Sequence, residues 1–487
     1  MTWTTTIGLA ASTLVASQTS GAEPFRKHPG NPHYFLFRGK PTILITSAEH
    51  YGSVLNLDFD YTKYLDTLAR EGMNHTRTFV GAYCEQAGDF GIARNTLAPL
   101  EGRFITPWAR SDQPGYPDGG NKFDLTRFDG AYFARMKDFV TKASERGIVI
   151  EINLFCPFYG DQMWALSPMN AQCNVNGVGG LPREQVYSLE SELLPYQEAM
   201  ARKIVAALQG FDNVYFEVMN EPYCGNVPMD WQERIADVIV EAERDLPNKH
   251  LISLNIANFR EQVEKLHPAV SLINFHYAFP PDTVATNWGL DVCIGDNETG
   301  FAGTSDARYR MEGWAFILAG GALYNNLDYS FVAGHEDGTF EYPGNQPGGG
   351  TTTLRAQLKV LADFMADLDF IHMQPSPEVL SAALPEHVKA EVLAEAGRQY
   401  AVYLYHAEGA EAVTVELALD VPVGKYTVEW VSPVTGKALR VLEIERRGQV
   451  TPLRLVSPEF TEDVALRVIA GWPTGPVPDD VTPVGHP

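Results

Sequence analysis

The chain has 487 residues, 45% hydrophobic and 20% charged, which is an ordinary globular composition. At about 150 residues per domain, this length predicts two or three domains. The 61 Asp and Glu side chains outnumber the 37 Lys and Arg, so the net charge is −24. A phosphate backbone or an anionic lipid surface needs a basic footprint, and this charge argues against both as partners.

The N-terminal residues 1–22 have features of a signal peptide. Residues 7–16 form a short apolar core, and Ser20-Gly21-Ala22 places small residues where a cleavage site is expected. The start of the segment has no Lys or Arg, so an N-terminal tail is the alternative interpretation. We expect a secreted or periplasmic protein. No later segment has the ~20 apolar residues that a membrane helix needs.

From about residue 40 to residue 372, short apolar strands alternate with amphipathic helices. The pattern predicts strands at 41–46, 73–79, 148–155, 214–219, 251–256, 271–275, 291–295 and 322–327. It predicts helices at 61–71, 128–146, 184–208, 231–245, 309–319 and 353–367, with a short helical turn at 261–266. Eight such units specify a (β/α)8 TIM barrel. The alternative, an open doubly wound sheet, is weakened because no Gly-rich phosphate loop follows an early strand.

After residue 375 the pattern changes to short strands separated by turn-forming residues. We expect strands at 388–393, 400–405, 413–417, 426–431, 439–444, 452–456 and 463–469. This spacing is typical of a small antiparallel β-sandwich. The predicted organisation is a signal peptide at 1–22, a barrel at 23–375, a β-sandwich at 376–472 and a Pro-rich tail at 473–487.

The cysteines do not form a recognisable framework. There are five of them, an odd number, and their spacing matches no zinc site. Cys156 and Cys173 could pair across a loop if the protein is exported. No set of His, Cys and Asp residues has metal-ligand spacing, and the sequence predicts neither a metal nor another cofactor.

Two carboxylic acids stand at the ends of predicted barrel strands. Glu221 lies in Asn220-Glu221-Pro222, directly after the strand at 214–219, and Glu298 follows the strand at 291–295. In a barrel of this kind, the site forms at the C-terminal ends of the strands. The fold therefore brings both acids to one mouth, although they are far apart in the sequence.

These motifs resemble glycoside hydrolase clan A, and within it the family 5 cellulase-like barrels. The clan carries Asn-Glu-Pro after strand four and a lone Glu at the end of strand seven, where this chain has Glu221 and Glu298. The segment GMNHTR, residues 72–77, matches the clan's G-x-N-x-x-R at strand two. His276 and Tyr277 follow strand six, where the clan also carries His and Tyr. Each motif is short, but all four occur in the right order and each stands at a strand end.

The resemblance implies a retaining glycoside hydrolase that cleaves a poly- or oligosaccharide by double displacement. It implies that Glu221 is the acid/base, that Glu298 is the nucleophile and that Asn220 binds the sugar 2-hydroxyl. Such chemistry needs two carboxyl groups ~5–5.5 Å apart, one protonated and one ionised. Arg77 would hold Glu298 ionised through a charge-assisted hydrogen bond. Pro222 lacks an N–H and fixes φ, so the chain turns sharply behind the acid.

His276 and Tyr277 are further candidates for contacts with the substrate and the two acids. Adjacent residues on a strand face opposite ways. Tyr277 can therefore reach Glu298 only if the strand has already ended before it.

Other side chains at strand ends and in long loops are candidates for binding sugar. Polar candidates are Glu49 and His50 at the first strand, Glu151 or Asn153 near the third, and Asn326 and Asp328 at the eighth. Many relatives carry a Trp at the eighth strand. Aromatic rings cover the weakly apolar C–H faces of sugars. The aromatic candidates are Tyr51, Trp108, Trp164, Tyr223, Trp288 and Tyr329.

The long segments after the second and third strands carry Trp108 and Trp164. They would wall one side of the mouth, and a walled pocket favours exo action on chain ends. The alternative function is a non-catalytic carbohydrate-binding protein on a degenerate barrel. The presence of both Glu221 and Glu298 favours the enzyme.

Overall fold

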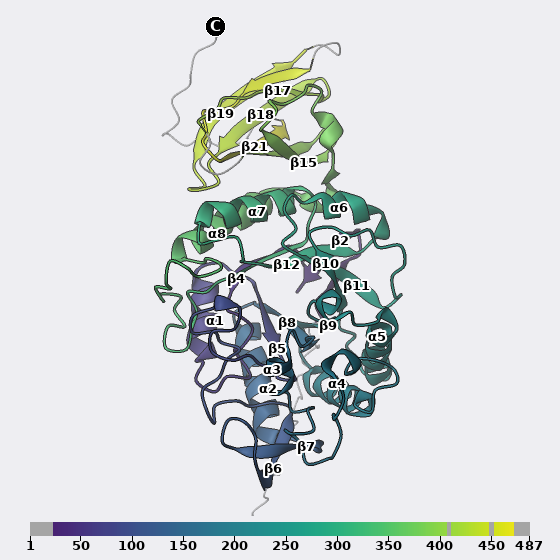
Figure 1. The fold of residues 1–487 in the computed structure, drawn as a ribbon. Helices are drawn as coiled ribbons and strands as arrows, with labels where there is room; N and C mark the ends of the chain where they lie inside the picture. The colour runs from purple at the N-terminus through teal and green to yellow at the C-terminus, as the bar shows by residue number, and fades with distance from the viewer. Residues whose placement is uncertain (1–22, 407–410, 448–451, 472–487) are drawn as a thin grey trace, which may run out of the picture.

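The computed structural model describes residues 23–406, 411–447 and 452–471 (Figure 1). Eight strands form one sheet in the order β4-β13-β12-β11-β10-β9-β8-β5, and each neighbouring pair is parallel. The strands are β4 Leu44–Ala48, β5 His75–Phe79, β8 Val149–Phe155, β9 Val214–Met219, β10 Ile252–Asn258, β11 Val270–His276, β12 Cys293–Thr299 and β13 Leu323–Leu327. The predicted TIM barrel is confirmed.

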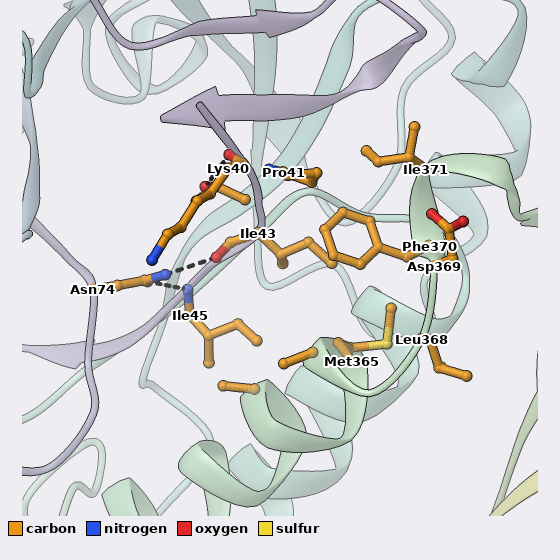
Figure 2. Close-up of a pocket in the computed structure, with 13 residues that line it drawn as sticks. Lys40, Pro41, Ile43, Ile45, Asn74, Met365, Leu368, Asp369, Phe370 and Ile371 are labelled. Carbon is orange, nitrogen blue, oxygen red and sulfur yellow. Dashed lines mark hydrogen bonds between the residues drawn. The ribbon is translucent and has the colours of Figure 1, made fainter. Parts of the chain in front are cut away.

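The barrel closes between β4 and β5, where the side chain of Asn74, just before β5, bonds to the backbone at β4 (Figure 2). Its side-chain amide donates to the carbonyl of Ile43 at 2.8 Å, and its side-chain oxygen accepts from the amide of Ile45 at 2.9 Å. A cavity of about 370 Å³ beside this seam is lined mainly by apolar side chains such as Met365 and Phe370. It lies at the N-terminal ends of the strands, the end of a barrel that serves stability rather than catalysis.

Helices surround the barrel (Figure 1). They are α1 Tyr61–Arg70, α2 Gly130–Glu145, α3 Asp161–Trp164, α4 Leu194–Leu208, α5 Met229–Glu243, α6 Asp282–Asn287, α7 Asp306–Leu318 and α8 Thr352–Ala366. Asp60 caps α1 by accepting from two backbone amides, as expected for an N-cap carboxylate. The helix predicted at 184–208 begins only at Leu194, with a proline in its first turn, and the turn predicted at 261–266 is not helical.

Two small sheets in the barrel half are absent from the sequence prediction. The strands β1 Arg26–His28, β2 Asn31–Phe37 and β3 Lys40–Thr42 form an antiparallel sheet before the barrel. The hairpin of β6 Trp108–Pro114 and β7 Asn121–Phe128 lies within the segment between β5 and α2. The single strand predicted at 41–46 is therefore divided between β3 and β4.

The C-terminal part is antiparallel, as predicted. A six-stranded sheet has the order β14-β15-β16-β21-β18-β19, and β17 pairs with β20. The strands are β14 Gln374–Pro375, β15 Lys389–Glu395, β16 Gln399–Tyr405, β17 Glu416–Leu419, β18 Gly424–Val431, β19 Ala438–Arg446, β20 Leu453–Val456 and β21 Asp463–Ala470.

This part packs against α7 of the barrel (Figure 1). The indole of Trp314 stacks on the ring of Tyr403 with centroids 5.4 Å apart. Beside it, the guanidinium of Arg310 pairs with the carboxylate of Asp463 at 2.8 Å. Apolar and charged contacts therefore join the two parts.

The predicted signal peptide at 1–22 and the predicted tail at 473–487 lie outside the described residues. No helix among the described residues is both long and apolar enough to cross a membrane.

Candidate active site

A cavity of about 350 Å³ opens at the C-terminal ends of the barrel strands. Glu221 and Glu298 both line it, so the fold does bring the two predicted acids to one mouth. The other lining residues are His50, Tyr51, Phe79, Glu85, Phe90, Leu97, Cys156, Tyr159, Asn220, Cys224, Asn258, Tyr277 and Phe301. Three of the lining residues are acids and none is Lys or Arg, so the cavity suits a neutral or cationic ligand.

Glu298 is surrounded by hydrogen-bond donors. One carboxylate oxygen accepts from the Tyr51 hydroxyl at 3.0 Å and from the Arg77 guanidinium at 3.2 Å. The other accepts from the Tyr277 hydroxyl at 2.7 Å. Hydrogen bonds and a positive charge stabilise the ionised form of a carboxyl group, which is the form that a nucleophile needs.

Glu221 stands on a sharp turn that ends β9. Its φ of 37° lies in the left-handed region, which is uncommon for a residue with a side chain. The turn directs the carboxylate into the cavity, where the Tyr159 hydroxyl donates to it at 2.5 Å. His276 Nδ1 lies 3.1 Å from its other oxygen, and the Tyr223 hydroxyl donates to that oxygen at 3.3 Å.

His276 lies between the two acids. Its Nδ1 is 3.1 Å from Glu221 and 3.5 Å from Glu298. Each of Glu221, His276 and Glu298 has one side-chain oxygen or nitrogen atom that lies within 4.8 Å of such an atom on each of the other two residues.

Glu221 and His276 shift each other's pKa. Burial alone would raise the pKa of Glu221, but the hydrogen bond and the charge of His276, joined by the Tyr159 and Tyr223 hydroxyls, lower that pKa to about 2. Burial alone would lower the pKa of His276, but the charge of Glu298 and the contact with Glu221 raise it. The resting site therefore holds its shared proton on the imidazole.

This ion pair predicts a pH window of stability. The lowered pKa of Glu221 contributes stability above its ordinary value of 4.5, which is lost as the pH falls toward 2. The raised pKa of His276 contributes stability below its ordinary value of 6.5, which is lost as the pH rises through the folded-state value. In His276→Asn, urea unfolding should show the greatest loss between about pH 4.5 and 6.5. A loss that is independent of pH would contradict the pairing.

Arg77 is fully buried beneath Glu298 and joins the acids of three strands. Its guanidinium donates to Glu151 at 2.5 Å and also to Glu217. It holds the side-chain oxygen of Asn220 at 2.8 Å. Burial, with the charge of Glu151, raises the pKa of Glu217 to about 8 despite the opposing charge of Arg77. Arg77 therefore orients both Glu298 and Asn220 from below.

Asn220 and Tyr277 both lie beside the catalytic cluster, which is the group formed by Glu221, His276 and Glu298. The amide of Asn220 donates to the Tyr159 hydroxyl at 2.9 Å. β11 ends at His276, and Tyr277 follows with a left-handed φ of 55°. This turn breaks the strand alternation, so His276 and Tyr277 both contact Glu298 although they are adjacent in the sequence.

Arg77 and His276 contact the two acids without lining the cavity, and four other predicted substrate-binding residues are also absent from the lining. The carboxylate of Glu49 accepts hydrogen bonds from Gly52, Ser53 and Thr96. Trp108 is completely buried in β6, and the Trp164 indole is buried against Phe158. The buried amide of Asn326 donates to Ser47 inside the barrel. Burial of large apolar rings and pairing of buried polar groups account for these positions.

The remaining candidates divide between the cavity and its surroundings. His50 and Tyr51 line the cavity, and His50 Nε2 lies 3.7 Å from Glu85. Tyr223 contacts Glu221 and also donates to Asn258 at 2.6 Å. Asn153 donates to Glu217 beneath the site, and Asp328 accepts from Ser47. Trp288 stacks on His33 before β12, and Tyr329 is buried behind Phe301.

Sequence reasoning missed Tyr159 and Glu85. Tyr159 follows β8 by four positions and contacts both Glu221 and Asn220. Glu85 accepts from the hydroxyl of Tyr83 at 3.0 Å and from Asn95. The same rule that found Glu221, a polar residue shortly after a barrel strand, would have found Tyr159.

Two groups of acids and histidines could offer atoms to a metal ion among the described residues. One is Glu221, His276 and Glu298 themselves, and the other is the surface group Asp369, His372 and Glu395. Cys156 and Cys173 are not paired with each other. Cys156 Sγ instead lies 3.7 Å from the amide of Asn220, and Cys173 contacts a backbone carbonyl.

Comparisons with known proteins agree with this geometry. The sequence profile of cellulase (glycosyl hydrolase family 5) matches residues 39–282. A glycoside hydrolase family 5 structure from Bacteroides vulgatus superposes with a TM-score of 0.60 at 13% identity, covering 92% of this chain and 93% of that one. A candidate glycoside hydrolase from the same organism gives 0.65 at 14% identity, covering 93% and 83%. At such identities these structures share the fold. No curated protein matches significantly.

Proposed function

The chain belongs to glycosyl hydrolase family 5, and from this premise we propose that it is a retaining exo-glycosidase in which Glu298 is the nucleophile and Glu221 the acid/base. The observation that carries the proposal is the spacing of the two carboxylates. One oxygen of each carboxylate lies within 4.8 Å of an oxygen of the other, a spacing closer to the ~5–5.5 Å of retaining enzymes than to the ~6.5–9.5 Å that leaves room for water in inverting ones.

In the first step, Glu298 attacks the anomeric carbon while Glu221 protonates the leaving oxygen. The resting pair of cationic His276 and anionic Glu221 holds as many protons as neutral His276 with protonated Glu221. One transfer along their 3.1 Å contact therefore produces the acid. As Glu298 loses its negative charge on forming the covalent bond, the charge that raises the pKa of His276 is lost.

In the second step, Glu221 acts as the base that activates water. Water attacks the glycosyl-enzyme bond and releases Glu298. Throughout, Arg77, Tyr51 and Tyr277 hold the Glu298 carboxylate from separate directions. We infer that Asn220, positioned by Arg77 and Tyr159, binds the sugar 2-hydroxyl beside it.

The size of the cavity supports exo action. Its volume of about 350 Å³ is at the low end of the roughly 300–1,000 Å³ that small-molecule sites occupy. Such a space suits a single terminal sugar better than an internal stretch of polymer. Glu85, Phe90 and Leu97, from the segment between β5 and β6, line it, so a long loop builds part of the wall.

Hydrolysis of a panel of 4-nitrophenyl glycosides and plant and microbial polysaccharides tests the activity. We expect release of 4-nitrophenol from at least one β-glycoside. Proton NMR of the first product should show the anomeric configuration of the substrate, because double displacement inverts the centre twice. If the opposite anomer appears first, Glu298 is not a nucleophile. If no member of the panel is cleaved, the proposed activity is wrong.

A further inference from the structure

Three aromatic side chains are exposed among the described residues, and all three surround the mouth of the catalytic cavity. Phe90 is 42% exposed, Phe259 62% and Phe301 40%. They come from separate loops: one after β5, one directly after β10 and one after β12. The three phenylalanines are called the collar below. Isolated exposed apolar residues are normal, but a group beside a site marks a contact surface.

The collar packs against tyrosines that hold the two acids of the catalytic cluster. Phe90 packs edge-on against Tyr159, which holds Glu221, with ring centroids 5.2 Å apart. Phe301 packs edge-on against Tyr277 at 6.1 Å, and Phe259 lies 6.5 Å from the same ring. Each collar ring therefore contacts a tyrosine that holds one of the two acids. Phe90 and Phe301 also line the cavity itself.

Two of the three residues are held in a strained backbone conformation. Phe90 has a φ of 55° and Phe259 a φ of 66°. Bulky residues seldom occupy this left-handed region, and such strain gathers at functional sites. The backbone amide of Phe259 donates to the carbonyl of His276 at 2.8 Å, which fixes the turn. The fold thus keeps Phe90 and Phe259 in backbone conformations that cost free energy, and it leaves their apolar rings exposed to water.

Polarity in the cavity changes with depth. The residues that can bind sugar hydroxyls lie deep: His50, Glu85, Asn220, Glu221 and Glu298 are each at most 8% exposed. The three exposed aromatic residues at the rim are phenylalanines, which have no hydrogen-bonding group, whereas Trp and Tyr offer one to a sugar. The exposed Cys224 and the partly exposed Asn258 also line the cavity, and their polar atoms contact Glu221 and Tyr223. A terminal sugar in the deep part would direct its leaving group outward, past the collar.

We propose that Phe90, Phe259 and Phe301 bind the leaving group, and that the preferred substrate is a glycoside of an apolar aryl or alkyl aglycone. This inference rests on the proposed glycosidase activity and names its substrate class. An apolar aglycone covers the rings and removes their surface from water. A second sugar could place its C–H face on these rings, but its hydroxyl groups would find no hydrogen-bond partner on them.

The first experiment compares methyl and hexyl glycosides of the sugar that the 4-nitrophenyl panel identifies. Their leaving groups have similar chemistry, so the ratio of kcat/KM reports the binding of the alkyl chain. With five additional methylenes, each half buried, we expect a preference for hexyl of roughly 30-fold. In the triple variant Phe90→Ser, Phe259→Ser, Phe301→Ser, the preference should fall below about threefold.

A matched control replaces three exposed valines of the C-terminal part, Val423→Ser, Val434→Ser and Val456→Ser. They are 50%, 43% and 50% exposed, and the hexyl preference should stay at its wild-type value. An enzyme that cleaves unsubstituted oligosaccharides but no alkyl or aryl glycoside would overturn the collar inference and leave the glycosidase proposal intact. An equal hexyl preference in wild type and collar variant would do the same.

A second readout needs no turnover and so separates the collar from the activity. The neutral apolar fluorophore prodan should bind the wild type and the valine control with equal affinity. It should bind the collar variant at least threefold more weakly, provided that urea unfolding shows this variant to be folded. Equal binding to all three proteins contradicts the collar as an apolar binding surface, whether or not a glycoside is cleaved.

Discussion

Glu298→Ala should lower hydrolysis by several orders of magnitude on every substrate, because no glycosyl-enzyme can form. Glu221→Ala should behave differently. It keeps the nucleophile and loses the proton donor, which typically contributes about 10²–10⁴-fold. A dinitrophenolate leaving group departs without a proton, so the first step should survive on a dinitrophenyl glycoside. The second step lacks its base, and mass spectrometry should detect an accumulated covalent intermediate.

Azide distinguishes the roles of the two acids. In Glu221→Ala, azide fits the space left by the carboxyl group, needs no base, and should restore turnover as a glycosyl azide of retained configuration. In Glu298→Ala, azide occupies the face of the nucleophile and any adduct should be inverted. The opposite pattern means that the two roles are exchanged. If neither variant impairs hydrolysis of a confirmed substrate, the site lies elsewhere.

Arg77→Met should lose both activity and stability. The guanidinium is fully buried and pairs with Glu151, Glu217 and Glu298. Its removal leaves buried carboxylates without a cation, which typically costs about 3–5 kcal/mol of unfolding free energy. Urea unfolding at pH 7 measures the loss. Adding Glu151→Gln to Arg77→Met removes a buried acid whose pKa is held low, against the effect of burial, by the charge of Arg77, and should restore part of the stability.

Arg355→Met provides the matched control. Arg355 is also fully buried and pairs with Glu71 and Asp328, but it does not line the catalytic cavity. Its loss should destabilise the protein by a comparable amount, while kcat of the folded protein stays near the wild-type value. If Arg77→Met loses stability but retains full kcat under folding conditions, Arg77 supports the fold alone and does not position the nucleophile.

The alternation of the sequence was sufficient to predict the barrel. The strand predicted at 214–219 coincides with β9, because its apolar run ends abruptly at the Asn-Glu-Pro turn. The hairpin of β6 and β7 was missed because its polar residues carry no two-residue periodicity. Its outer face is exposed, while only a few side chains such as Trp108 and Phe123 are buried.

Short motifs predicted the residues at the centre of the site. They did not predict the buried Glu217 or the collar phenylalanines. Glu221, Glu298, His276 and Tyr277 stand at or next to the C-terminal ends of strands, where topology alone brings them together, and Arg77 lies in the middle of β5. Glu217 lies in the middle of an apolar strand, and its pairing with Arg77 arises only when the barrel closes. The collar could not be predicted from the sequence either, because the exposure of a phenylalanine depends on the loop conformation and is not encoded in any local pattern.

The contact between α7 and the C-terminal sheet limits whether the barrel can be separated from that sheet and combined with other domains. Trp314 and Arg310 are buried partly against Tyr403 and Asp463 of the C-terminal sheet and partly against Phe364 and Gln357 of α8. A barrel cut free at residue 375 would expose part of a large aromatic ring and remove the acid that pairs with Arg310, on the helix that directly follows β12. The two parts therefore depend on each other to cover this face of α7. In a modular enzyme, recombination that preserves activity would have to transfer them together.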